Sequence, residues 1–114
     1  MTIEYKQIAQ ARENSTNPVS LYSPSKDAAG NTETANIFVK FVNVTTAAVS
    51  VRVFHDDDGT TYDETTAIAW DIQIDPGTIL EMDKIFMNDA DGNLAYRSSV
   101  ANAITATVYT VVKT

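Results

Sequence analysis

The sequence predicts an all-β protein, a single-domain antiparallel β-sandwich or jelly roll of about eight short strands. Two observations predict this fold class. First, apolar and polar residues mostly alternate with a period of two, which is typical of strands that bury one face. Second, turn-forming pairs such as Asn17-Pro18, Asp58-Gly59 and Pro76-Gly77 interrupt the alternation about every eight to twelve residues. A chain of 114 residues is long enough to bury one core of this kind.

The N-terminal segments are the least regular part of the chain. We expect strands over residues 3–9 and 18–23, separated by the polar stretch ARENSTNP, which we interpret as a mobile arm or linker. A helical turn around residues 6–13 is the competing interpretation, because Ile8, Ala9 and Arg12 would then share a face. The chain is thus divided into an N-terminal strand and arm, residues 1–17, and a sandwich, residues 18–114, which together form one domain.

The strand expected over residues 35–44 is apolar on both faces. Ile37, Val39 and Phe41 lie on one face, while Phe38 and Val42 lie on the other. Such a strand is central in its sheet, or a neighbouring subunit covers its second face. A second sheet of the same chain is the alternative cover for Phe38.

The other strands alternate more simply. Val49, Val51 and Val53 share one face of residues 47–55. In residues 66–74 one face holds Ile68, Trp70, Ile72 and Ile74, so we expect Trp70 in the core rather than on the surface. The remaining strands are expected over residues 78–84, 93–99 and 103–112.

Ten residues, HDDDGTTYDE, form a dense acidic segment between two of these strands. Their spacing does not fit an EF-hand, because with Gly59 at position 6 the ligand positions 1 and 12 fall on Phe54 and Thr65. We therefore interpret residues 55–64 as a hairpin or inter-strand loop whose charge keeps a sheet edge soluble. An irregular calcium site is the alternative, with Asp56, Asp58 and Asp63 as its candidate ligands.

Other site chemistries find little support in the composition. The chain has no cysteine, which excludes disulfides and thiolate chemistry, and His55 is its single histidine, so no zinc site is expected. Neither a nucleophile with its base nor a phosphate-binding glycine loop is evident, and we expect no catalytic residue and no cofactor. The candidates for a sugar-stacking platform would be Trp70, Tyr62, Tyr96 and Tyr109.

The charge distribution argues against nucleic acid and membranes as partners. The formal net charge is −7, and the eight Lys and Arg residues are scattered singly, so no basic patch forms in the sequence. No apolar run of about 18 residues is present to span a bilayer. The opening residues, MTIEYKQIAQARENS, lack an apolar core of signal-peptide length, so we expect a soluble protein that is not exported.

Five segments follow one another in an order that resembles a known family: TIEYKQIAQAR, VSLYSPS, NIFVKFVNVTTAAVSVRVF, AIAWDIQIDPGTILEMDKIFM and SSVANAITATVYTVV. They are similar to small single-domain virion proteins of tailed bacteriophages, found as capsid decoration proteins or tail-associated components. The chain departs from the family pattern at SPSKDAAGN and in the acidic loop of residues 55–66. The matching positions span nearly the whole chain and are Leu21, Tyr22, Pro24, Asn43, Pro76, Gly77, Ala101, Asn102 and Thr105.

The resemblance implies a non-enzymatic structural protein of the virion. In the first place it implies a capsid decoration (cement) protein, assembled in the host cytoplasm, that binds the major capsid protein or other virion proteins as a homotrimer. Two alternatives stay open: a tail fibre or adaptor component that contacts the host surface, and a carbohydrate-binding module stabilised by calcium. We predict partner contacts from the second face of the 35–44 strand and from the N-terminal segment, namely Phe38, Lys40, Val42, Val44, Tyr5, Ile8 and Arg12.

Overall fold

The structure is a computed structural model that describes residues 3–24, 34–56, 59–87 and 92–113. Within these ranges the chain forms strands and connecting turns without a helix, and no helix there is long and apolar enough to cross a membrane. The strands are β1 (Ile3–Ala11), β2 (Val19–Tyr22), β3 (Thr34–Asn43), β4 (Val49–Asp56), β5 (Ala67–Ile74), β6 (Ile79–Met87), β7 (Asn93–Ser98) and β8 (Ile104–Lys113).

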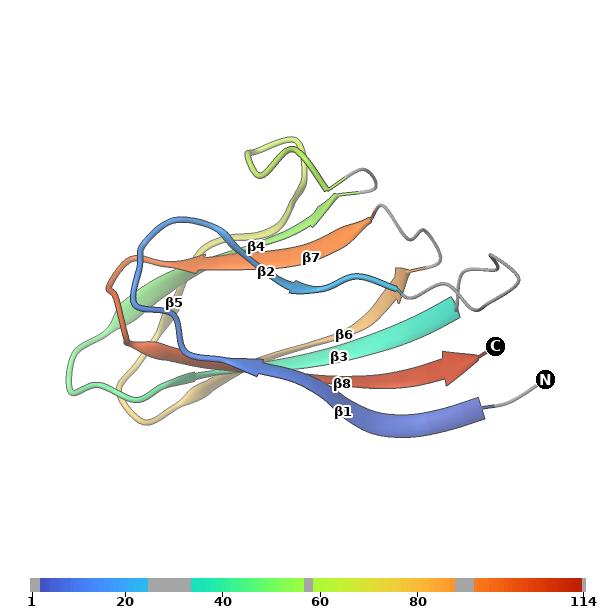
Figure 1. Ribbon diagram of the computed structural model, residues 1–114. Helices are drawn as coiled ribbons and strands as arrows, with labels where there is room; N and C mark the ends of the chain where they lie inside the picture. The colour runs from blue at the N-terminus through green and yellow to red at the C-terminus, as the bar shows by residue number, and fades with distance from the viewer. Residues whose placement is uncertain (1–2, 25–33, 57–58, 88–91, 114) are drawn as a thin grey trace.

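Two four-stranded antiparallel sheets pack face to face (Figure 1). The first sheet has the strand order β1-β8-β3-β6, and the second has the order β2-β7-β4-β5. Every connection except the β4–β5 hairpin passes from one sheet to the other, and this order is that of a jelly roll. The predicted fold class is therefore confirmed, and each expected strand is present with ends shifted by a few residues at most.

The core lies between the inner faces of the two sheets. On β3 the residues Ile37, Val39 and Phe41 are fully buried, and Val51 and Val53 of β4 face them from the second sheet. Because side chains of a strand alternate between its faces, Phe38, Lys40 and Val42 point outward from the first sheet. The sequence predicted this division correctly.

The pairing of the central strands differs from the pairing of the edge strands. The registers of β3 with β8 and of β4 with β7 run without interruption. The four edge strands β1, β2, β5 and β6 each contain at least one extra residue relative to their partner. Such a bulge bends the edge strand and moves the following side chains to the opposite face of the sheet.

The bulge in β5 makes one sequence prediction wrong. Val51 pairs with Ile72 but Val53 pairs with Ala69, so β5 holds an extra residue between these pairs, where Asp71 has a left-handed φ of 51°. Ile74 is buried as expected, but Trp70 faces outward and is 37% exposed. Ile68 and Ile72 are exposed as well, and Ala69 packs against the core instead.

The N-terminal segment is a strand and not a helical turn. Residues 3–11 form β1, which pairs with β8 along its length and is part of the first sheet. The strand expected over residues 3–9 is therefore confirmed, and the competing helical turn around residues 6–13 is wrong. Of the stretch interpreted as an arm or linker, only Ala11 belongs to the strand. Residues 12–18 connect the two sheets, and the backbone amide of Glu13 donates to the buried Tyr96 hydroxyl at 3.4 Å.

Asn43 fixes the end of the sandwich where two connections cross between the sheets. Its amide nitrogen donates to the carbonyl oxygens of Ala47 and Ile74, both at 2.8 Å. Its amide oxygen accepts from the backbone N–H and the hydroxyl of Thr45, at 2.9 and 2.7 Å. The residue is fully buried, and all four bonds would be lost with the side chain. One side chain thus joins the β3–β4 turn to the end of β5.

Replacing Asn43 with Ala should destabilise the protein by roughly 2–4 kcal/mol, because several buried backbone groups lose their partner. Urea denaturation followed by circular dichroism measures this difference. Asn36→Ala, at an exposed position of the same strand, is the matched control and should change the free energy of unfolding by less than about 0.5 kcal/mol. Equal effects of the two variants would contradict the role given to Asn43.

Candidate functional site

Four aromatic side chains cross the outer face of the first sheet from edge to edge. Tyr5 comes from β1, Tyr109 from β8, Phe38 from β3 and Phe86 from β6. Phe38 and Tyr109 are cross-strand neighbours, and their ring centres are 6.0 Å apart. Tyr5 is 81% exposed and Phe86 is 65% exposed. We call these four residues the aromatic band.

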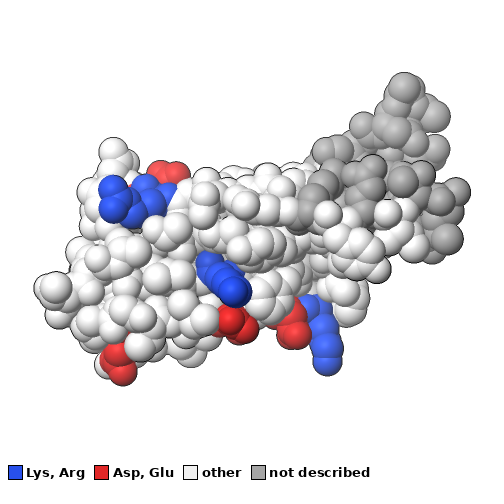
Figure 2. All heavy atoms as spheres, turned by 90° about the horizontal axis from the view of Figure 1, so that it is seen from below, with Lys and Arg blue, Asp and Glu red and all other residues white. Residues whose placement is uncertain are grey.

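The aromatic band borders a shallow hollow of about 600 Å³, whose lining includes Tyr5, Phe38 and Tyr109. The described part of the chain supplies no third layer over this face, as Figure 1 shows. Figure 2 views the same face from below and shows few charged side chains among large uncharged areas. Asp83 and Lys84 are charged residues in the lining of the hollow. A loose ion pair also lies on this face, with 4.0 Å between Lys40 Nζ and Glu81 Oε1. An exposed apolar sheet face of this kind is typical of a protein-binding surface.

The structure brings together four of the seven predicted contact residues. Tyr5, Phe38, Lys40 and Val42 all face outward from the first sheet. Val44 lies just beyond the end of β3 and is exposed. Two residues lie elsewhere: Ile8 packs against the core from the β1 bulge, and Arg12 is exposed in the connection after β1. Whether these residues contact a partner stays a prediction.

Sequence reasoning missed two members of the aromatic band. From the sequence, Tyr109 is a candidate only for sugar stacking. Tyr109 alternates with buried residues of β8, and this pattern gives no sign of an aromatic neighbour. Only the pairing of β8 with β3, which are far apart in the sequence, places it beside Phe38. Phe86 follows the β6 bulge at Lys84, where φ is 57°, and periodicity does not reveal such a bulge.

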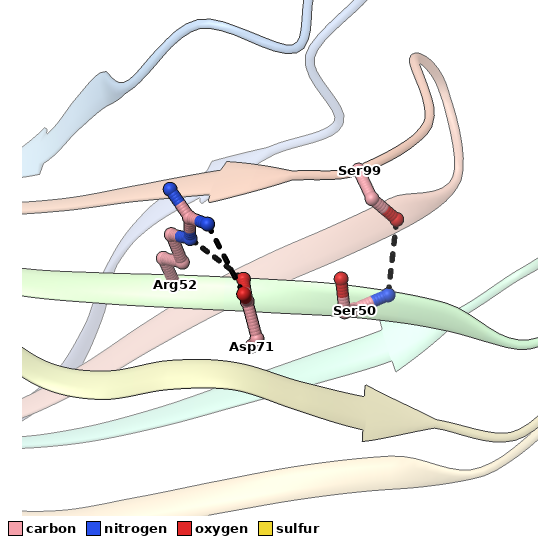
Figure 3. A network of polar contacts seen from close by, with 4 residues as sticks. All are labelled: Ser50, Arg52, Asp71 and Ser99. Carbon is pink, nitrogen blue, oxygen red and sulfur yellow. Dashed lines mark hydrogen bonds and ion pairs between the residues drawn. The ribbon is translucent and has the colours of Figure 1, made fainter.

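The outer face of the second sheet carries a different, polar arrangement around Trp70. The guanidinium carbon of Arg52 lies 3.7 Å from the centre of the indole ring. Arg52 also forms two hydrogen bonds to Asp71, from Nε at 2.6 Å and from Nη2 at 3.1 Å (Figure 3). Nearby, the backbone N–H of Ser50 donates to the Ser99 hydroxyl and ties β4 to the end of β7.

Two further aromatic rings support Trp70 on this face. Phe54 points outward from β4 but is only 1% exposed, because other rings cover it. Its ring centre lies 6.4 Å from that of Trp70 and 6.0 Å from that of Tyr62. Tyr62 in turn donates its hydroxyl hydrogen to the carbonyl of Gly59. Of the aromatic residues considered for sugar stacking, Trp70 and Tyr62 lie together here, while Tyr96 is in the core and Tyr109 is on the other sheet.

Of the acidic segment, residues 59–64 lie in the connection between the paired strands β4 and β5, as the sequence predicted, whereas His55 and Asp56 are the last two residues of β4. Asp56 is buried, and its carboxylate accepts hydrogen bonds from the backbone N–H groups of Thr60 and Thr61 at 2.9 and 2.6 Å. The carboxylate of Asp63 accepts from the N–H and hydroxyl of Thr65, and these bonds lower its pKa.

These bonds give the two carboxylates a role in loop structure. The third calcium candidate, Asp58, lies outside the described residues. Among the residues that are described, no group of three acidic or histidine side chains is placed to hold a metal ion. His55 is half-buried at the end of β4, opposite Leu94 of β7.

Burial raises the pKa of Tyr96, whose ring contacts Phe41 in the core.

Comparison with known proteins adds little to this geometry. No protein-family model matches the chain, and no curated protein matches it. Among solved structures, a chain in the structure of infectious bursal disease virus Gx strain is similar, with 12% sequence identity and a TM-score of 0.43. The similarity covers 97% of this chain but 30% of that chain. Values this low carry no argument about function.

The Arg52–Asp71 pair makes a testable pH prediction. Its hydrogen bonds hold the pKa of Asp71 below the ordinary value of 3.8. A carboxylate whose pKa is lowered by folding stabilises the folded state above its unfolded pKa, and this contribution is lost as the pH falls through the folded pKa. Titration of side-chain carboxyl groups by NMR should show Asp71 titrating at lower pH than in Arg52→Met, where its pKa returns toward the ordinary value. An unchanged Asp71 titration in that variant would contradict the assignment.

Proposed function

We propose that the protein is a non-enzymatic structural component of a tailed-bacteriophage particle. In this proposal it is a capsid decoration protein that binds the outer surface of the shell through the aromatic band. The observation that carries the proposal is the band itself: four aromatic side chains on a sheet face without a covering layer in the described chain. Exposed aromatic residues are enriched in the energetically important centres of protein interfaces.

The surroundings of the aromatic band suit a broad protein surface better than a small ligand. The exposed apolar residues of this face extend beyond the hollow to Ile3 at one edge of the sheet and Ile79 at the other. The formal charges of Lys40 and Glu81 cancel, although the whole chain carries −7. A locally balanced face allows close approach of another protein surface with less long-range repulsion than the net charge suggests.

Binding to a repeated shell lattice explains how a small protein of this kind would act. A protein that binds the assembled shell but not its separated subunits stabilises the assembled state by mass action. If three copies bind together, each additional contact acts at a high effective concentration. The resemblance of the sequence to small virion proteins supports this role and the homotrimer, and jelly rolls are common in virus coats and lectins. Fold alone does not assign function, so the aromatic band remains the main support.

Copy number in purified particles tests the location. Quantitative mass spectrometry against the major capsid protein should give a ratio of the same order as that protein. A copy number far below that of the major capsid protein would instead place the protein in the tail, the second candidate location. Absence from particles would overturn the virion role in either form.

Two surface substitutions test the binding face. Tyr5→Lys and Phe86→Lys together should leave the melting temperature nearly unchanged, because both side chains are largely exposed. The same double variant should lose binding to particles that lack the protein, measured by co-sedimentation. Val100→Lys, at an exposed apolar position in the β7–β8 connection, is the control and should bind normally. Normal binding by the double variant would exclude the aromatic band as the contact.

A further inference from the structure

A second hollow, of about 390 Å³, lies on the outer face of the second sheet, away from the aromatic band. Its volume falls in the range of small-molecule sites, about 300–1,000 Å³. Residues 16–18 line it from the β1–β2 connection, and Asp63 and Glu64 line it from the acidic loop. The lining also includes Trp70, Tyr62 and Arg97. Three segments far apart in the sequence therefore meet around one polar, aromatic cavity.

Arg97 is the unusual residue of this hollow. It lies directly opposite Arg52 on the neighbouring strand, and like charges in this position repel. Asp71 forms its hydrogen bonds with Arg52, and it also lies close enough to Arg97 for that positive charge to help lower the Asp71 pKa. The Arg97 side chain itself forms no hydrogen bond with any described residue. Its Nε is buried and has no acceptor. A buried donor without a partner costs stability. Arg97 also lines the hollow, where its guanidinium can donate to a ligand.

Trp70 is held at the surface by a costly local structure. The β5 bulge places Asp71 in the left-handed region, at φ 51°, and turns the indole outward. Arg52 lies over the ring at 3.7 Å, and the Phe54 ring packs against Trp70 nearly perpendicular to it, with 6.4 Å between the ring centres. The side chain is therefore fixed before any ligand arrives, which reduces the entropy that binding would cost.

The hollow offers a ligand both hydrogen-bond donors and hydrogen-bond acceptors. Arg97 offers N–H donors, and Glu64 is an exposed carboxylate, an acceptor. Asp63 is engaged by Thr65 and Arg52 by Asp71. The acidic groups disfavour an anion, and the arginine disfavours a cation. A neutral molecule with several hydroxyl groups can pair with both the donors and the acceptors, because each hydroxyl group donates and accepts hydrogen bonds. A sugar ring also presents an apolar C–H face suited to contact with an aromatic ring.

We propose that this hollow binds a neutral saccharide, with Trp70 and Tyr62 contacting the ring and Arg97 and Glu64 binding its hydroxyl groups. The site is separate from the aromatic band and does not depend on the proposed virion role. It also requires no calcium ion, unlike the carbohydrate-binding alternative raised by the sequence.

Trp70 is the single tryptophan of the chain, so its fluorescence reports on this hollow directly. The protein is titrated with neutral oligosaccharides of glucose, galactose and N-acetylglucosamine, and binding is checked by calorimetry. We expect a saturable change in emission with at least one of them. No saturable response to any of these sugars in the millimolar range overturns the proposal. A response confined to acidic oligosaccharides or to acidic peptides overturns it as well.

Two variants separate binding from folding. Arg97→Met keeps the apolar part of the side chain and removes the guanidinium, which forms no hydrogen bond with a described residue, so it should fold normally by near-ultraviolet circular dichroism and bind at least about tenfold more weakly. Glu64→Gln, in the exposed loop, should also weaken binding without affecting the fold. Lys40→Met changes the charge by the same amount as Arg97→Met but lies on the first sheet, and should bind like the unmodified protein. Equal affinity of Arg97→Met and Lys40→Met would show that the hollow is not the site.

Discussion

The hydrogen bonds of one buried amide, that of Asn43, hold the two sheets in their relative positions at one end. A jelly roll crosses repeatedly between its sheets, and each crossing leaves backbone groups that no ladder satisfies. Asn43 supplies two donors and two acceptor sites at a point where the carbonyl oxygens of the β3–β4 turn and of the end of β5 converge. Its own backbone also takes part, because its N–H donates to Thr78 and its carbonyl accepts from Gly77. The positions of β3, β4, β5 and β6 are therefore linked through a single residue.

Each sheet packs one face into the core and has a second, outer face. The two outer faces differ in chemical character. The first sheet presents aromatic rings and few charges, whereas the second presents a tryptophan among arginines and carboxylates. The first face is broad and suits another protein surface. The second face contains a hollow between loops and offers both hydrogen-bond donors and acceptors. Because the two faces lie on opposite sides of the sandwich (Figure 1), occupation of one leaves the other accessible.

The sequence was sufficient for the fold wherever the period of two runs without interruption. In β3, β4 and β8 the alternation of apolar residues identified the buried face and placed Phe38 on the opposite face. Whether a second sheet of the same chain covers Phe38 was left open by the sequence. The prediction failed at β5, because the bulge at Asp71 inverts the alternation and no composition signal marks a bulge of this type. The candidate sites were less predictable. Tyr109 meets Phe38, and Arg97 meets Arg52, only through pairing of strands distant in the sequence.

The irregular edges of both sheets have a consequence for how copies of the molecule meet. An unbroken edge strand offers a continuous row of backbone groups to the edge of a second copy, which is the usual route to open-ended fibrils. Here all four edge strands among the described residues carry an extra residue, while the central pairs are regular. The extra residues break the row that a second strand would follow. Association of copies by edge-to-edge strand pairing is therefore disfavoured. Contacts through the sheet faces are favoured instead, and such contacts stop once both faces are covered.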